Sequence, residues 1–254
     1  MGTSELDNCD GGTGDLGVIL VHGGLHGGWC WDNLRRELTF PSVAVDLPGR
    51  GASSEQLLSI TLEDWVSSAA AQASDLDAGR LILVGHSLGG LTLPGLAAAL
   101  GDCVHAMVFV AALGPAEGQT VAQLLNPADP GAVLDAGGLF PVPPFEVACY
   151  MLGLEDLPPD EIDPWLRRLA PEPPLPITTP VDRSGMPRVR TIYVRGERDV
   201  AVGPELAAQI IHNLGNEIEE VVVSAGHNMI ATHPRLIARI VEGAAEVNAR
   251  PQIA

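Results

Sequence analysis

The sequence predicts an α/β domain with a mostly parallel β-sheet of about six strands and helices on both faces. Six short apolar runs, rich in β-branched residues, alternate with longer segments in which apolar residues recur at helical spacing. Several of the short runs are apolar almost throughout, which is typical of strands that are covered on both faces. Strand–helix alternation of this kind indicates parallel strands joined by crossover helices.

The elements can be placed in chain order from these patterns. The predicted strands are Gly17–His22, Val43–Asp46, Arg80–Gly85, Val104–Ala111, Val189–Val194 and Ile218–Val223. The predicted helices are Trp31–Leu38, Leu62–Asp75, Leu91–Leu100, Pro204–Leu214 and Pro234–Asn248.

One segment breaks the alternation. Prolines cluster in residues 115–186, where we find no strong strand pattern. A structureless loop of that length is unusual in a compact domain, so we expect an inserted lid, with helical pieces at Phe145–Leu152 and Asp160–Leu169. Residues 1–114 and 187–254 would then form the core.

Composition narrows the classes of function. The formal net charge of −18 argues against nucleic acid and anionic membranes as partners. All 14 basic residues are arginine, so mechanisms that need a lysine are excluded. The chain has no run of about 18 uncharged apolar residues that could span a membrane. Its polar, acidic start does not resemble a signal peptide, so we expect a cytoplasmic protein that acts on a small molecule; a homodimer is left open.

Cysteine and histidine spacing gives no sign of a metal or other cofactor. The four cysteines, Cys9, Cys30, Cys103 and Cys149, lie far apart without a C-x-x-C pair, and we interpret them as inert thiols. His22 and His26 lack carboxylates at metal-ligand spacing, so we expect them to bind carbonyls of their own loop.

The strongest chemical signal is the run Gly85-His86-Ser87-Leu88-Gly89-Gly90. It follows a predicted strand directly and opens a helical pattern, which is the setting of a G-x-S-x-G nucleophile elbow. The turn would hold Ser87 in a strained conformation and lift its hydroxyl above the sheet. Ser87 is therefore the candidate nucleophile.

A serine nucleophile needs a base and a carboxylate that orients the base. His227 follows the strand Ile218–Val223 through a short flexible turn, at the sheet edge where ligands bind, and is our candidate base. Asp199 follows the strand Val189–Val194 and is our candidate acid. The rival positions are His212 and His233 for the base, and Glu197, with Asp102 and Glu117 as weaker choices, for the acid.

Acyl transfer also needs backbone amides that stabilise the oxyanion. We expect one from Leu88, the residue after the nucleophile, and one from Gly24 in the glycine-rich loop after the first strand. Gly23 or Leu25 would replace Gly24 if that loop were shifted by one residue.

The segments VHGGLHGGWCW, DLPGRGAS, LVGHSLGG, GERD and AGHNMIATHP together resemble one branch of the α/β-hydrolase fold family. That branch holds plant methyl salicylate esterases, hydroxynitrile lyases and bacterial ester and carbamate hydrolases. The resemblance implies a catalytic triad at Ser87, Asp199 and His227 and an oxyanion hole at Gly24 and Leu88. The plant lyases carry threonine where Gly23 stands and lysine where Asn228 stands, so the resemblance implies an esterase rather than a lyase.

The expected activity is hydrolysis of a small, fairly apolar carboxylic ester through an acyl-enzyme. Lactones, carbamates and amides remain open as substrates of the same triad, as does a ligand-binding homologue with little turnover. The lid would set substrate choice, and the pocket residues we name for it are Leu25, Leu113, Trp165 and Met229.

Overall fold

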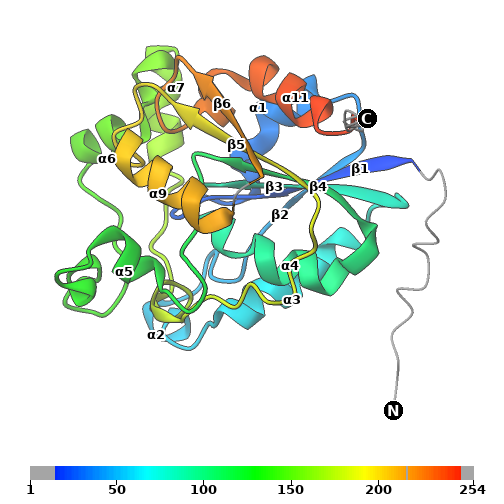
Figure 1. The fold of residues 1–254 in the computed structure, drawn as a ribbon. Coiled ribbons are helices and arrows are strands. Elements are labelled where there is room, and N and C mark those ends of the chain that lie inside the picture. Colours follow the sequence, from blue (N-terminus) through cyan, green and yellow to red (C-terminus); the bar gives the residue numbers. More distant parts are fainter. Residues whose placement is uncertain (1–14, 216, 247–254) are drawn as a thin grey trace.

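The computed structural model describes residues 15–215 and 217–246, which form one sheet of six parallel strands with helices on both sides (Figure 1). The order across the sheet is β2-β1-β3-β4-β5-β6. The predicted α/β class is confirmed, and every predicted strand is present within two residues of its expected bounds. The strands are β1 (Leu16–Val21), β2 (Ser42–Val45), β3 (Arg80–His86), β4 (Val104–Val110), β5 (Arg190–Gly196) and β6 (Ile218–Val223).

Side chains of the central strands alternate between two apolar cores. Met107 and Phe109 of β4 point to one face, whereas Ala106 and Val108 point to the other. The first face is covered by α3 (Leu62–Ala73), α4 (Leu93–Leu100) and α9 (Pro204–Leu214), and the second by α1 (Asp32–Glu37), α10 (Met229–Thr232) and α11 (Pro234–Gly243) (Figure 1). Burial on both sides explains why these strands are apolar almost throughout.

The chain between β4 and β5, residues 111–189, is the β4–β5 segment. It carries four short helices: α5 (Val121–Leu125), α6 (Phe145–Leu152), α7 (Pro159–Leu166) and α8 (Pro174–Thr178). Helix α6 has the predicted bounds, whereas α7 begins one residue before the predicted piece and ends three residues before its end. Together α6 and α7 enclose a small apolar cluster of their own, which also contacts Ala231 of α10. The segment therefore packs beside the loop that follows β6.

Strand order places two loops side by side. The chain leaves β1 outward to β2 and returns on the other side of β1 as β3, so the direction of winding reverses between β1 and β3. In open α/β sheets ligands bind at the carboxyl edge at such a point. The loops after β1 and β3 are those in which the sequence places the oxyanion amides and the nucleophile.

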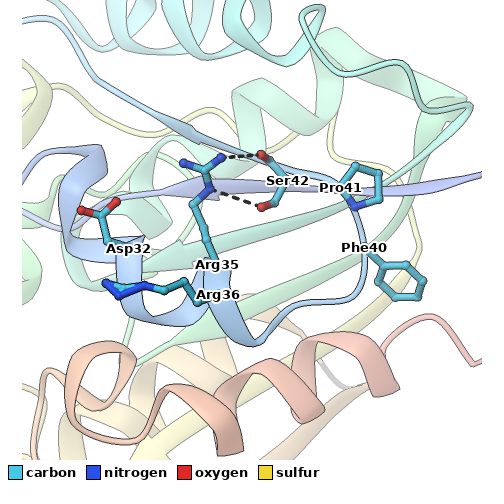
Figure 2. A pocket seen from close by; sticks show the side chains of 6 residues that line it. All are labelled: Asp32, Arg35, Arg36, Phe40, Pro41 and Ser42. Atoms are coloured by element: carbon cyan, nitrogen blue, oxygen red, sulfur yellow. Dashed lines mark hydrogen bonds between the residues drawn. The ribbon is translucent and has the colours of Figure 1, made fainter.

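A surface hollow of about 500 Å³ lies at the amino end of β2, away from this edge (Figure 2). Both of its guanidinium groups are already engaged, since Arg35 donates to Ser42 and Arg36 to Asn33. Its lining is Asp32, Arg35, Arg36, Phe40, Pro41 and Ser42.

The interpretation of the cysteines as inert thiols holds only in part. Cys30 and Cys149 carry free thiols, whereas Cys103 is disulfide-bonded, so the interpretation of Cys103 as an inert thiol is wrong. Cys9, like the end of the helix predicted to reach Asn248, lies outside the described residues. Among the helices of residues 15–215 and 217–246, none is long and apolar enough to cross a membrane.

Candidate active site

Ser87 stands at the sharp turn between β3 and a short 3₁₀ turn, Ser87–Leu91. Its φ of 49° is a left-handed conformation that non-glycine residues rarely adopt, as an elbow requires. The turn is tight because Gly89 lies against the end of β1, where a Cβ on Gly89 would lie 2.5 Å from the Val21 carbonyl oxygen. The elbow therefore depends on the glycine two residues after the serine.

The structure brings Ser87, His227 and Asp199 together from three separate loops. The Ser87 hydroxyl lies 2.9 Å from His227 Nε2, and His227 Nδ1 lies 2.9 Å from Asp199 Oδ2. Asp199 Oδ1 accepts hydrogen bonds from the amides of Ala201 and Val202, which fix the carboxylate. An Nδ1–H that donates to Asp199 leaves Nε2 of His227 free to accept the serine proton.

The rival positions lie elsewhere. Glu197 is exposed, two residues before Asp199, and His212 is exposed on α9. His233 lies between α10 and α11, where its Nδ1 is bonded to the Thr232 hydroxyl. None of these three side chains takes part in the hydrogen-bonded array of Ser87, His227 and Asp199.

The glycine-rich loop after β1 has its carbonyl groups held by two histidines. His22 Nδ1–H donates to the Gly23 carbonyl at 2.8 Å, and His26 Nδ1–H donates to the Gly24 carbonyl at 2.7 Å. The tautomers follow from the opposite ring atoms, because Nε2 of His22 accepts the Leu47 amide and Nε2 of His26 accepts the Trp165 indole N–H. Both histidines therefore bind loop carbonyls, as the sequence predicts.

The four candidate oxyanion amides differ in whether they already donate a hydrogen bond. The Leu25 amide donates to Glu172 Oε1, which removes it from consideration. Within the described residues, the amides of Gly23, Gly24 and Leu88 donate to no protein acceptor. Gly24 is partly exposed and lies beside Leu88, whereas Gly23 is buried against the Ser87 Cβ. This arrangement favours Gly24 over Gly23.

Burial keeps the histidines around the site neutral. It lowers the pKa of His22 to about 3 and that of His26 to about 4, with the nearby Arg50 charge acting in the same direction on both. Burial also holds the pKa of His86 well below its ordinary value, and the neighbouring rings of His227 and His26 add to this effect. The His86 and His26 imidazoles near His227 are thus uncharged.

A charged pair beside the glycine-rich loop is missing from the sequence analysis. Arg50 donates through Nη2 to Glu172 Oε2, and the Glu172 side chain is fully buried. Burial raises the pKa of Glu172, although Arg50 and the Leu25 amide oppose the shift. Glu172 has a proline on each side in the sequence and lies 122 residues after Arg50, so no sequence pattern links the two.

The predicted pocket residues occupy different positions. Leu25 adjoins Gly24, the amide of Leu113 donates to the Ser87 carbonyl at 2.8 Å, and Trp165 donates to His26. Met229 is fully buried in the core on the second face of the sheet, and the Leu113 side chain belongs to the core on the first face.

The β4–β5 segment is also bonded to the loop that carries His227. The Asn228 amide donates to the Leu152 carbonyl at 2.9 Å, and the Asn228 side-chain amide donates to His26 Nε2 at 3.2 Å. Gly153 and Gly226 pack backbone to backbone, where a Cβ on Gly153 would lie 2.8 Å from Gly226. The segment, the His227 loop and the glycine-rich loop are thus joined around the array.

Comparison with known proteins gives a family and several relatives. Residues 18–240 match the model described as "Alpha/beta hydrolase family". Methylesterase 7 of Arabidopsis thaliana is 38% identical over 103 residues, which are 38% of this chain and 40% of that protein. The carbendazim hydrolyzing esterase of a Nocardioides species is 33% identical over 121 residues, which are 45% of this chain and 49% of that protein. These matches thus span less than half the length of either relative.

One relative and two solved structures align over most of the chain. Methyl jasmonate esterase 1 of Vitis vinifera is 26% identical over 85% of this chain and 91% of that protein. An extracellular alpha/beta-hydrolase from a Paenibacillus species has a TM-score of 0.78 at 20% identity, covering 91% of this chain and 100% of that chain. A pyrethroid hydrolase from Sphingobium faniae has a TM-score of 0.75 at 22% identity, covering 92% of this chain and 99% of that chain. At such identities the two structures show a shared fold.

Proposed function

Because the chain belongs to the alpha/beta hydrolase family, we propose that it is a serine hydrolase that cleaves a small, fairly apolar carboxylic ester. The observation that carries the proposal is the continuous hydrogen-bonded array from Ser87 through His227 to Asp199, with both contacts at 2.9 Å. This is the arrangement of nucleophile, base and orienting carboxylate found in acyl-transferring hydrolases. Three relatives of the chain are named as esterases, and this supports an ester as the substrate.

The reaction starts at the serine hydroxyl. Ser87 Oγ forms a bond to the acyl carbon while its proton passes to His227 Nε2. The carbonyl oxygen becomes an oxyanion, which accepts hydrogen bonds from the amides of Gly24 and Leu88. Asp199 holds His227 in the required tautomer and stabilises the imidazolium that forms. The array thus supplies a nucleophile and a base, and the two amides supply a site for the developing charge.

The tetrahedral intermediate then collapses. Its bond to the leaving oxygen breaks, and the alcohol departs with the proton from His227. A water molecule next gives its proton to His227 and attacks the acyl-enzyme, again through an oxyanion. When the acyl–Oγ bond breaks, Ser87 recovers the proton and the carboxylic acid leaves. The same steps apply to lactones, carbamates and amides, so the acyl and leaving groups have to be identified by assay.

Ser87→Ala is the decisive variant. We expect its kcat for p-nitrophenyl acetate and butyrate to fall by roughly 10⁴–10⁶-fold, the scale seen when a triad member is removed. A fluorophosphonate probe should label the wild-type protein at Ser87 and leave the variant unlabelled. Ester hydrolysis that persists in a folded Ser87→Ala protein would refute the proposal, as would a wild-type protein that neither hydrolyses these esters nor takes the label.

A further inference from the structure

Leu25 has a strained backbone that the β4–β5 segment holds from both sides. Its φ of 68° lies in the left-handed region, which disfavours a leucine. Its amide donates to Glu172 Oε1, and its carbonyl accepts the Ala170 amide at 2.9 Å. Strain of this kind persists only where surrounding contacts impose it. Here the contacts come from residues 170–172, far from Leu25 in sequence.

These bonds set the orientation of two consecutive peptide groups. The Gly24–Leu25 peptide is held at its carbonyl by His26 and at its amide by Glu172. The preceding Gly23–Gly24 peptide is held at its carbonyl by His22. Its remaining polar group is the Gly24 amide, which has no acceptor among the described residues. The direction of that N–H is therefore determined by the groups that hold its neighbours.

We propose that Glu172 is a positioning residue, which aims the Gly24 amide at the oxyanion by holding the Leu25 amide. This inference rests on the proposed function and assigns a residue to the same site. The carboxylate acts through two oxygens, because Oε1 accepts the Leu25 amide while Oε2 accepts Arg50 Nη2. Arg50 fixes the carboxylate, and Glu172 fixes the loop.

The proposed role of Glu172 can be separated from a purely structural role of the Arg50–Glu172 ion pair. Buried ion pairs contribute little net stability, and neutral replacements of similar size are often tolerated. The charge can therefore be removed while the hydrogen-bond acceptor for Leu25 is kept or deleted. The double variant Arg50→Met/Glu172→Gln keeps an acceptor oxygen at Leu25. Its matched control, Arg50→Met/Glu172→Met, has a side chain of similar length with no such oxygen.

We expect the Met/Met variant to have a kcat about 10- to 100-fold below that of the Met/Gln variant, with KM within about threefold. This loss is smaller than the roughly 10²–10³-fold effect of deleting an oxyanion donor, because the amide is misdirected rather than removed. Affinity for a trifluoromethyl ketone, whose tetrahedral adduct carries an oxyanion, should weaken in parallel with kcat. Thermal unfolding of both variants confirms that the comparison is between folded proteins.

Equal kcat and equal trifluoromethyl ketone affinity in the two variants would overturn the inference. A raised KM at unchanged kcat would also overturn it, since that result indicates substrate binding. If Met/Met does not fold, Glu172→Asp replaces it, because aspartate keeps the charge but has a shorter reach to Leu25; a wild-type kcat in Glu172→Asp overturns the inference. A wild-type protein that hydrolyses no ester and takes no fluorophosphonate label refutes the proposed function instead.

Discussion

At the scale of single residues, the site combines two strained residues, Ser87 and Leu25, with several buried, neutral histidines. His26 is the most connected of these, since its Nδ1–H holds the Gly24 carbonyl and its Nε2 accepts from Trp165 and Asn228. A protonated His26 would lose both of the latter bonds, because Nε2 would carry a hydrogen. The bonds around the glycine-rich loop thus depend on a neutral imidazole.

Acid should therefore destabilise the folded protein through His26. Its pKa falls from the ordinary 6.5 to about 4 because of burial, with His227 and Arg50 nearby acting in the same direction. Between these values the unfolded chain binds a proton that the folded chain does not, so stability falls with falling pH, by on the order of 3 kcal/mol at pH 4. We expect the Tm of wild type to fall more steeply between pH 6.5 and 4.5 than that of His26→Gln.

His212→Gln is the matched control, because His212 is exposed on α9. Its Tm should follow the wild-type slope over the same pH range. Parallel slopes for wild type and His26→Gln would show that His26 does not contribute to acid sensitivity.

At the scale of elements, the β4–β5 segment contributes Trp165 from α7 to the neighbourhood of the site. The indole donates to His26 Nε2 at 3.2 Å, and its ring lies 4.7 Å from that of Trp29. Trp165 is partly exposed, so part of its side chain is accessible to solvent. The segment can therefore influence the site through the shape of this side chain.

Trp165→Ala should alter selectivity more than Trp165→Phe. Alanine removes the ring that would bound the acyl pocket, whereas phenylalanine removes only the N–H and part of the ring. We expect the ratio of kcat/KM for p-nitrophenyl butyrate over acetate to change by about tenfold in the alanine variant, the scale of a methylene-sized difference in a pocket. An unchanged ratio would show that α7 does not determine specificity.

The sequence predicts the sheet and the array better than it predicts the β4–β5 segment. Strands buried on both faces produce apolar runs that are visible locally, and the elbow motif fixes Ser87 within β3–turn–helix geometry. The helices that the sequence analysis missed, α2 (Ser54–Leu57), α5, α8 and α10, have only four or five residues each, which is too short for a periodic pattern. Glu172 carries no local signal, because its partners come from the loops after β1 and β2.

At the scale of the whole molecule, two apolar cores on opposite faces of one sheet support a site at its edge. Phe109 of β4 is fully buried in the first core and lies on a strand with a neighbour on each side. Its removal leaves a cavity that rigid surroundings fill only in part.

Phe109→Ala should destabilise the protein without abolishing the chemistry. We expect a loss of about 3–5 kcal/mol, which lowers Tm by about 6–20 °C in a chain of this size. The folded fraction should retain a kcat near that of wild type, since Phe109 takes no part in the hydrogen bonds that join the three array residues. Phe145→Ala, at a side chain 48% exposed on α6, is the control and should shift Tm by less than about 2 °C. Equal shifts in the two variants would contradict this account of the core.

The distribution of the array over the chain has a consequence during protein synthesis. Ser87 is made 140 residues before His227, and Asp199 precedes His227 by 28. A nascent chain on the ribosome therefore holds the proposed nucleophile long before it has the proposed base, and a product of translation interrupted before His227 cannot assemble the full set. Hydrolytic activity would then appear only after His227 has been translated and β6 has joined the sheet, so that activity itself reports the folding of the sheet.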